Sequence, residues 1–561
     1  IGLRLWQLQV AQYQTLASEA TEQRMLYRNI AAKRGEIYAT ERTADGSERR
    51  VALAVNRKAY NVYADTRSVQ NAERTATLLS DLIGLPATDL VTSLSKPNDP
   101  YVLLKRRVLE DTAEEIRKLA LPGIGLEETV ERFYPNNTIG SHVVGFVTYG
   151  DQGLHGQYGI EGRLDKLLAG TSGTIRSERD AQGIWIALAD RQLSPVVNGS
   201  TMVLTIDWTI QFTACRALDE WVAKHGADGG SVVVVNPKTG AILAMCGTPD
   251  YNPNTYNETQ HLSMFNNPAT FLDYEPGSIF KPITMAAALD QQKVTPDTTY
   301  TDEGFVRFGA NVIKNSDGQA HGVQTMTSVL NQSLNTGAIF VMRTIGASVF
   351  RKYVEDFGFG GTTGVELSQE AAGNIKPLYQ KNEIYSATAS FGQGLTVTPL
   401  QMVMAYAAIA NGGTLVQPYL VREIDHPDGT REIPQPVTIR RVMAERTATL
   451  LSGMLVSVVE HGHGKRAGVP GYFIAGKTGT AQVPSKNASG YEPGVTIGSF
   501  VGFGPVEDPR FAMIIRIDRP RDVQFAESSA APLFGEIAKA ILQYYEVAPR
   551  ANTPATHPSK P

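Results

Sequence analysis

Residues 471–480 read GYFIAGKTGT, a stretch that satisfies two unrelated catalytic signatures. Gly471, Gly476, Lys477 and Thr478 fit G-x-x-x-x-G-K-[ST], the phosphate-binding P-loop of nucleotide hydrolases. The letters K-T-G within it also form a triplet used by one class of serine enzymes that act on amides. The two signatures predict different folds, so the surrounding sequence has to decide between them.

The P-loop requires a glycine-rich loop between a strand and a helix that begins at the lysine. The four positions between the two glycines are instead YFIA, whose bulky apolar side chains favour a pleated strand over an anion-binding loop. Beyond Thr478 the chain continues GTAQVPS, where Gly479 disfavours a helix and Pro484 would break one. The sequence therefore predicts a strand or turn here, and the nucleotide hydrolase remains a remote alternative.

The K-T-G interpretation requires a serine nucleophile and a base. The segment EPGSIFKPITMAAALD supplies Ser278 and Lys281 on one face of a helix. Because proline is tolerated only in a first helical turn, Pro282 predicts that this helix begins near Ser278. Backbone donors and the helix dipole would then stabilise an oxyanion beside the serine.

A third segment, NQSLNTGAIF, gives Ser333 and Asn335 in S-x-N spacing. Positions two apart do not face one another on a helix, so both side chains would share a cleft only if they lie in a turn. Asn335, Thr336 and Gly337 supply suitable turn residues. Taken alone, the segment is more typical of a connector that caps a helix.

Each motif also has a chance copy in the chain. Ser93 with Lys96 repeats S-x-x-K, Ser485 with Asn487 repeats S-x-N, and residues 238–240 repeat K-T-G in what reads as a hairpin turn. The second K-T-G precedes both serine motifs, and the second S-x-x-K lies in the other half of the chain. The chemistry is therefore predicted from the ordered set of three motifs and not from any one of them.

Length and charge limit the possibilities further. A chain of 561 residues exceeds one ordinary core, so two or more domains are expected. The net charge of −4 offers no basic excess for binding many phosphates, which excludes nucleic acid as a partner. No uninterrupted run of about 20 apolar residues occurs, so the chain as given does not span a membrane. Because it begins at Ile1 with a helix-like IGLRLWQLQVAQY, we expect that an upstream segment has been removed.

Cysteine and histidine give little sign of redox or metal chemistry. The two cysteines are Cys215 and Cys246; buried apolar packing is favoured for them, and a disulfide between them stays open. His461 and His463 form the only local histidine pair, in a glycine-rich HGHG turn that is expected to be solvated. The sequence predicts no metal site and no cofactor.

Two regions and a tail are expected. Residues 1–200 mix short β-like runs (GEIYA, YNVYA, HVVGFV) with a charged helical stretch at residues 104–121. Residues 201–546 contain two predicted antiparallel hairpins, SVVVVN-PKTG-AILAMC and SFVGFGP-VEDPR-FAMIIRID, the second followed by a helix with one apolar face. Residues 547–561 are rich in proline and small polar residues, which predicts a disordered tail. Strands framing helical blocks predict an α+β fold.

In their order, the three motifs resemble those of the penicillin-binding proteins: S-x-x-K, S-x-N and K-[TS]-G. The middle motif here is S-L-N, whereas class A β-lactamases have S-D-N. EPGSIFKPITMAAAL, SFGQGLTVTPLQM, GKTGTAQ and VGFGP are similar to the transpeptidase domain. RGEIYA, YGIEGRLDKLLAG and LTIDWTIQ are similar to the amino-terminal module of the class B, monofunctional subgroup, and no glycosyltransferase motif of class A precedes them. VYADT, LKRRV and FYPNNTIGSHVVGFV are closer to division-type than to elongation-type members.

The resemblance implies an architecture and a set of roles. Residues 201–546 would form a transpeptidase domain with an antiparallel sheet framed by helices, as in serine β-lactamases, and residues 1–200 an elongated mixed α/β pedestal of the dimerisation type. Ser278 would attack the penultimate D-Ala carbonyl of a peptidoglycan stem peptide. Lys281 would be its base, neutral because burial and a second cation lower its pKa.

The remaining site residues follow from the same resemblance. Ser333 and Lys477 would pass the proton to the leaving amine, and Asn335 would hold the base and the substrate amide. The backbone N–H groups of Ser278 and Thr480 would form the oxyanion hole. The hydroxyls of Thr478 and Thr480 would bind the terminal carboxylate, with Gly479 allowing close approach.

The implied ligands are stem peptides, as D-Ala-D-Ala donor and amine acceptor, and the β-lactams that mimic them. The implied protein partners, a membrane glycan polymerase and division proteins, would bind the amino-terminal module. A single amino-terminal membrane anchor, absent from this chain, would place the catalytic domain in the periplasm. Three alternatives stay open: a D,D-carboxypeptidase or β-lactamase that transfers the acyl group to water, a non-enzymatic β-lactam sensor, and the remote P-loop NTPase.

Overall fold

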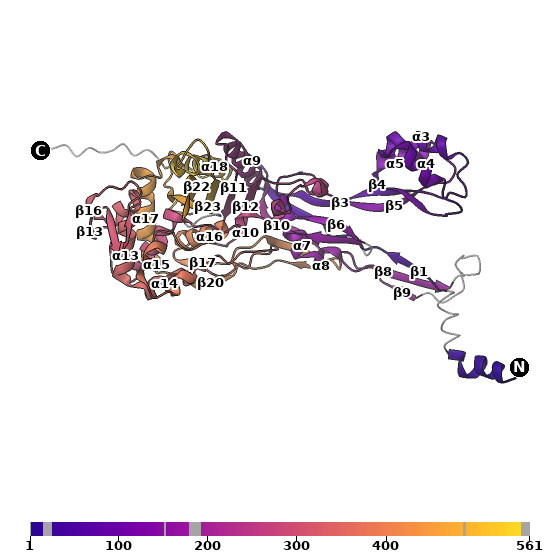
Figure 1. The fold of residues 1–561 in the computed structure, drawn as a ribbon, viewed down its shortest axis with the longest axis horizontal. Helices are drawn as coiled ribbons and strands as arrows, with labels where there is room; N and C mark the ends of the chain where they lie inside the picture. Colours follow the sequence, from indigo (N-terminus) through magenta and orange to yellow (C-terminus); the bar gives the residue numbers. More distant parts are fainter. Residues whose placement is uncertain (1, 15–24, 151–152, 179–191, 486–489, 551–561) are drawn as a thin grey trace. The chain divides into compact units, whose positions relative to one another are not determined.

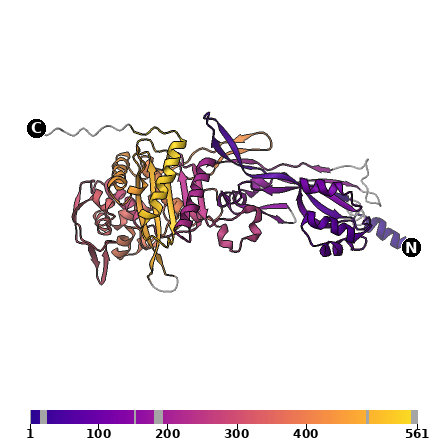
Figure 2. The same cartoon turned by 90° about the horizontal axis from the view of Figure 1, so that it is seen from above.

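The computed structural model describes residues 2–14, 25–150, 153–178, 192–485 and 490–550 (Figures 1 and 2). The chain forms two compact units, each discontinuous in sequence. The first consists of residues 1–36, 52–135 and 168–200, and the second of residues 37–51, 136–167 and 201–561. The predicted domain bounds, 1–200 and 201–546, stay predictions. The structure adds that residues 37–51 and 136–167 lie in the second unit.

The first unit is built on residues 52–64 of the long strand β3 (Glu48–Ala64), which pairs antiparallel with β4 (Val102–Leu109) and β5 (Ile124–Phe133). A hydrophobic core joins this sheet to three helices. Its remaining elements are α1 (Gly2–Trp6), η1 (Gln7–Ala11), β1 (Met25–Ile30), α3 (Ala72–Ile83), α4 (Ala87–Leu94), α5 (Glu110–Lys118), β8 (Gly173–Glu178) and β9 (Gln192–Ser194), with α8 (Asp165–Ala169) at its edge.

The predicted helix at residues 104–121 is partly wrong. Its first part belongs to strand β4, and α5 begins only at Glu110. Val102 and Val108 are buried in β4 while residues between them are more exposed, and the strand is fixed by its ladder with β3. The charged residues at helical spacing, Glu110, Glu114 and Arg117, lie in α5 as predicted, and pairing with β3 makes the residues before them a strand.

The second unit is organised around a five-stranded antiparallel sheet in the order β12-β11-β23-β22-β21. Both predicted hairpins are confirmed: β11 (Gly229–Val235) with β12 (Ile242–Thr248), and β22 (Tyr491–Gly504) with β23 (Phe511–Asp518). Helices α9 (Trp208–Lys224) and α18 (Ala530–Tyr544) share one core with the sheet, and α16 (Pro399–Ala410) contacts it as well (Figure 1). Strand β21 (Ala475–Pro484) is left at the edge.

Residues 142–144, predicted to be extended, are instead in the short helix α6 (Ser141–Val144), and the strand β6 begins only at Phe146.

The other elements of the second unit connect and cover this sheet. These elements are β2 (Ile37–Arg42), α6 (Ser141–Val144), β6 (Phe146–Gly150), β7 (Gly153–Gln157), α7 (Gly159–Arg163), β10 (Thr201–Asp207), η2 (Pro253–Glu258), η3 (Leu262–Phe265), α10 (Pro268–Phe271), η4 (Gly277–Phe280), α11 (Lys281–Asp290), β13 (Thr299–Asp302), β14 (Phe305–Phe308), β15 (Asn311–Lys314), β16 (Gly322–Thr325), α12 (Met326–Asn331), α13 (Asn335–Ile345), α14 (Ala347–Asp356), η5 (Lys376–Tyr379), α15 (Glu383–Ala389), β17 (Thr414–Val416), β18 (Val421–Asp425), β19 (Arg431–Glu432), β20 (Thr438–Arg441), α17 (Glu445–His461), η6 (Lys465–Ala467) and η7 (Ala526–Ser528).

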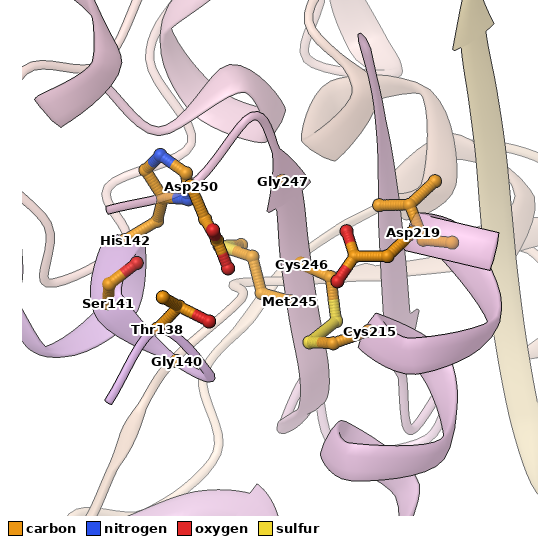
Figure 3. A pocket seen from close by; sticks show the side chains of 11 residues that line it. Thr138, Gly140, Ser141, His142, Cys215, Asp219, Met245, Cys246, Gly247 and Asp250 are labelled. Atoms are coloured by element: carbon orange, nitrogen blue, oxygen red, sulfur yellow. A yellow bond between two sulfur atoms is a disulfide. The ribbon is translucent and has the colours of Figure 1, made fainter. Parts of the chain in front are cut away.

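Cys215 and Cys246 form a disulfide between α9 and β12, so the favoured expectation of two free buried thiols is wrong (Figure 3). Both residues are buried as expected, with exposed fractions of 9% and 4%. The two segments lie far enough apart in sequence that local patterning could not show that their Cα atoms come within 5.3 Å. A small cavity beside the disulfide, lined also by Asp219 and Asp250, has a volume of about 10 Å³ and holds no more than about one water.

Removing this disulfide is expected to weaken the second unit. Cys215 and Cys246 are 31 positions apart, and their disulfide closes a loop of this length in the unfolded chain. Replacing both with alanine removes the cross-link, and the gain in entropy of the unfolded chain should lower the free energy of unfolding by about 3 to 4 kcal/mol. Denaturant titration of both proteins measures this loss. A midpoint unchanged from wild type would contradict a stabilising role for the bridge.

The carboxyl end of the described chain includes the first residues of the predicted tail. Residues 547–550 pack against the segment that precedes β21: Tyr472 OH donates to the Val547 carbonyl at 2.5 Å, and Arg550 N donates to the Gly471 carbonyl at 2.9 Å. The rest of the predicted tail, 551–561, lies outside the described residues. Within the part of the chain that the structure describes, no helix has the length and apolar character needed to span a membrane.

Candidate active site

Residues 475–480 of the stretch GYFIAGKTGT form the start of the edge strand β21, in register with β22, with Lys477 opposite Val501, and residues 471–474 precede the strand. The strand runs without a break from Ala475 to Pro484, and no helix begins at Lys477. Without that helix the P-loop has no anion-binding N-terminus, so the nucleotide-hydrolase alternative is wrong.

Ser278 lies in the short 3-10 turn η4, which leads directly into α11 at Lys281. The predicted helix start is confirmed, with Pro282 in the first turn of α11. Ser278 is partly exposed, whereas Lys281 is buried, with an exposed fraction of 1%. The segment thus offers an accessible hydroxyl one helical turn from a desolvated amine.

The S-x-N motif occupies the turn between α12 and α13, where Ser333 adopts a left-handed conformation with φ of 58°. Asn335 begins α13 and is fixed by strand residues: its backbone N–H donates to Asn315 Oδ1 at 2.9 Å, and its Nδ2 donates to the Lys314 carbonyl at 2.9 Å. The turn between the two helices, and not a helix face, therefore carries Ser333. The contact predicted between Asn335 and Lys281 stays a prediction.

The two buried lysines meet at Ser333. Lys281 Nζ donates to the Ser333 carbonyl and, at 3.2 Å, to Ser333 Oγ. Lys477 Nζ donates to the same Oγ at 3.0 Å and to the Thr478 carbonyl at 3.2 Å. Residues from α11, the S-x-N turn and β21 are thus joined in one hydrogen-bonded cluster, although they are far apart in sequence.

Burial shifts the protonation of both amines. Burial, helped by the charge of Lys477, lowers the pKa of Lys281 well below its usual 10.5. Burial also lowers the pKa of Lys477, to about 7, against the opposing effect of the Glu527 carboxylate. Both effects on Lys281 favour its neutral amine, the form that can accept a proton, while Lys477 is partly protonated near pH 7.

Strand β21 passes close to the serine turn. A Cβ on Gly479 would lie 2.9 Å from Ile279 Cγ2 and 3.0 Å from the Pro276 carbonyl oxygen, so only glycine fits at this crossing. A Cβ on Gly277 would lie 3.4 Å from the Thr480 carbonyl oxygen. Thr480 Oγ1 accepts a hydrogen bond from Ala526 N at 3.1 Å. The strand residues predicted to bind the oxyanion and the substrate carboxylate therefore lie beside the turn that carries Ser278. Their roles stay predictions.

Two contributors to this site were not found from the sequence. The first is Gly392, with φ of +82°, whose carbonyl accepts a hydrogen bond from Gly277 N at 3.0 Å. The second is the pair formed by His463 and Glu527. His463 thus contacts a carboxylate, where a solvated turn was expected. Among the described residues no group of histidine, cysteine or carboxylate side chains is arranged to hold a metal ion.

Comparison with known proteins identifies the family. The chain matches the penicillin binding protein transpeptidase domain over residues 230–543 and the penicillin-binding protein dimerisation domain over residues 29–204. The chain belongs to the class B penicillin-binding proteins. The resemblance inferred from the ordered motifs is confirmed, as are the α+β fold and the enzyme class, a serine-type D,D-transpeptidase.

Similar class B penicillin-binding proteins come from diverse bacteria. Stage V sporulation protein D of Bacillus subtilis is 34% identical over 90% of this chain and 78% of its own length. Peptidoglycan D,D-transpeptidase FtsI of Escherichia coli is 30% identical over 99% of this chain and 90% of its own. The crystal structure of penicillin binding protein 3 from Mycobacterium tuberculosis, complexed with aztreonam, aligns with a TM-score of 0.72 at 29% identity, covering 93% of this chain and 98% of that one.

Proposed function

We propose that this protein cross-links peptidoglycan stem peptides through an acyl-enzyme on Ser278. The observation that carries the proposal is the convergence of Lys281 and Lys477 on Ser333 Oγ, with Lys281 one helical turn after Ser278. A buried amine whose lowered pKa favours the neutral form, an accessible hydroxyl and a hydroxyl held between two lysines are the components that proton transfer during amide cleavage requires.

Acylation begins when Ser278 Oγ attacks the penultimate D-Ala carbonyl and its proton passes to Lys281 Nζ. The oxyanion of the tetrahedral intermediate accepts hydrogen bonds from the N–H groups of Ser278 and Thr480. When the C–N bond breaks, Ser333 Oγ donates a proton to the departing D-Ala amine and is reprotonated by Lys477. A neighbouring stem peptide's amine then attacks the ester, and its proton returns through the same groups as Ser278 Oγ is released.

Substrate orientation is assigned to β21 and the S-x-N turn. The terminal carboxylate would bind the hydroxyls of Thr478 and Thr480 beside Lys477, with Gly479 permitting the close crossing. Asn335 would bind the substrate amide. A β-lactam presents the same carboxylate and a reactive amide, so it would acylate Ser278 and leave slowly.

The cellular setting follows from the similarity to FtsI and remains part of the proposal. The protein would act in septal wall synthesis, with its catalytic unit in the periplasm and an amino-terminal membrane anchor outside this chain. Residues 1–200 would serve as the pedestal that binds a membrane glycan polymerase and division proteins.

The test is the intact mass of the protein after incubation with a penicillin, followed by peptide mapping. We expect one stable adduct, on Ser278, and none in the Ser278→Ala variant. Ser93→Ala, in the chance S-x-x-K of the other unit, is the matched control and is expected to react like wild type. An adduct that persists in Ser278→Ala at the same site would refute the nucleophile assignment.

The same preparation separates the other serine-acyl functions with purified stem peptides. Cross-linked product supports the transpeptidase. Release of D-Ala without cross-linked product would indicate a carboxypeptidase, and acylation by penicillin without any stem-peptide turnover would indicate a sensor.

A further inference from the structure

A histidine and a carboxylate outside the three motifs form a pair near Lys477. His463 Nδ1 and Glu527 Oε1 are 2.5 Å apart, and each side chain is a little under half exposed. Glu527 belongs to η7, after the sheet, and His463 follows α17. Neither residue belongs to the three motifs that define the site.

The pair is attached to both walls of the site. On one wall, Ala526 N, next to Glu527, donates to Thr480 Oγ1 at 3.1 Å, which fixes η7 against β21. On the other, His463 N donates at 3.2 Å to the carbonyl of Asn331, the last residue of α12 before the turn that carries Ser333. The contact between His463 and Glu527 therefore links the K-T-G strand to the S-x-N turn.

Glu527 is the anionic group that acts on Lys477. Its carboxyl pKa is lowered, first by the hydrogen bond with His463 and further by the charges of His463, Lys477 and Arg466, so it is ionised at neutral pH. These three basic side chains act on Glu527 from the loop after α17, from β21 and from η6. The Glu527 charge in turn raises the pKa of Lys477, opposing burial.

Lys281 has a different environment. Burial and the charge of Lys477 both lower its pKa, and both therefore favour the neutral amine. The catalytic scheme needs this asymmetry, because one lysine must accept a proton while the other stays protonated beside a carboxylate ligand. The two amines hydrogen-bond to the same Ser333 Oγ, so the three motifs alone do not make the protonation of the two lysines different.

We propose that Glu527, held in place by His463, is a positioning residue that keeps Lys477 protonated and so lets β21 bind substrates with a terminal carboxylate. The proposal rests on the proposed function, since it concerns the same acylation reaction. Glu527 acts through Lys477 and not on the substrate itself. Removing its charge should therefore change how acylation depends on pH more than it changes the fold.

The experiment measures the second-order rate constant for acylation by a fluorescent penicillin between pH 5.5 and 9.5. In wild type the rate is expected to fall on the alkaline side as Lys477 loses its proton. In Glu527→Gln this fall should move to lower pH by about one unit, which makes acylation about tenfold slower at pH 8 but only about twofold slower at pH 6. Glu527→Asp retains the charge and is expected to restore most of the wild-type profile.

Glu536→Gln is the matched control, because it removes a carboxylate from α18 that bonds to Trp221 and does not appear among the groups acting on Lys477. Its profile should match wild type. An unshifted profile in Glu527→Gln, or equal slowing in Glu527→Gln and Glu527→Asp at every pH, would overturn the proposal. Wild-type protein that forms no Ser278 adduct at any pH would instead refute the proposed function, so the two failures are distinguishable.

Discussion

Replacing Lys281 with methionine is expected to slow acylation of Ser278 by a β-lactam by about 10²- to 10⁴-fold, the range for loss of a positioned general base. The variant keeps the volume and shape of the side chain in a buried position, so the fold should survive. What it loses is the amine that receives the serine proton. Stopped-flow acylation with a fluorescent penicillin measures the rate.

Lys293→Met is the matched control for this variant, because Lys293 is exposed just beyond α11. It should acylate at the wild-type rate. If Lys281→Met also reacts within about tenfold of wild type, a residue other than Lys281 accepts the proton.

The same variant has a second expected property, a higher free energy of unfolding at neutral pH. The pKa of Lys281 is lowered in the folded protein and is near its usual 10.5 when unfolded, so between these values the unfolded chain binds more protons. Stability from this group is therefore fully present above about 10.5 and is lost as pH falls toward the folded pKa. Methionine removes that loss. The free energy of unfolding should therefore rise less between pH 7 and pH 9 in Lys281→Met than in wild type, by up to about 1.4 kcal/mol per pH unit. Denaturant titrations at the two pH values measure this difference.

The sequence was sufficient for the part of the site that depends on local constraints. Pro282 can occupy only a first helical turn, and this fixed the start of α11 and the positions of Ser278 and Lys281. The apolar YFIA run and Pro484 excluded a P-loop helix, which left a strand. The order of the motifs then selected the family, because their chance copies do not occur in that order.

What the sequence could not show are contacts between distant segments. His463 follows α17 and Glu527 lies in η7, so the two side chains meet only once α17 and the sheet are packed. The same holds for the disulfide, whose partners lie on α9 and β12. The predicted helix extended too far toward residue 104, because pairing with β3 makes the residues before α5 a strand. Periodicity reports one element at a time, and these features belong to pairs of elements.

Gly392→Ala is expected to damage the site from outside the three motifs. Gly392 has φ of +82°, and a Cβ there would lie 2.1 Å from the carbonyl oxygen of Gly277, a contact that no rotamer change can relieve. The same backbone pair is joined by the hydrogen bond from Gly277 N to the Gly392 carbonyl at 3.0 Å. The turn that carries Ser278 must therefore move. A displacement of about 1 Å at a reacting group costs about 10²-fold in rate, which is the slowing of acylation we expect.

Gly394→Ala separates this displacement from ordinary backbone strain. Gly394 lies in the same loop with φ of +76°, but the nearest atom to its Cβ would be Thr388 Oγ1, a side-chain hydroxyl, at 3.3 Å. Both variants should lose about 1 to 2 kcal/mol of unfolding free energy from the left-handed conformation. Only Gly392→Ala should also lose the acylation rate, because only its Cβ meets the backbone of the serine turn. Equal acylation rates in the two variants would mean that the loop supports the fold and not the position of Ser278.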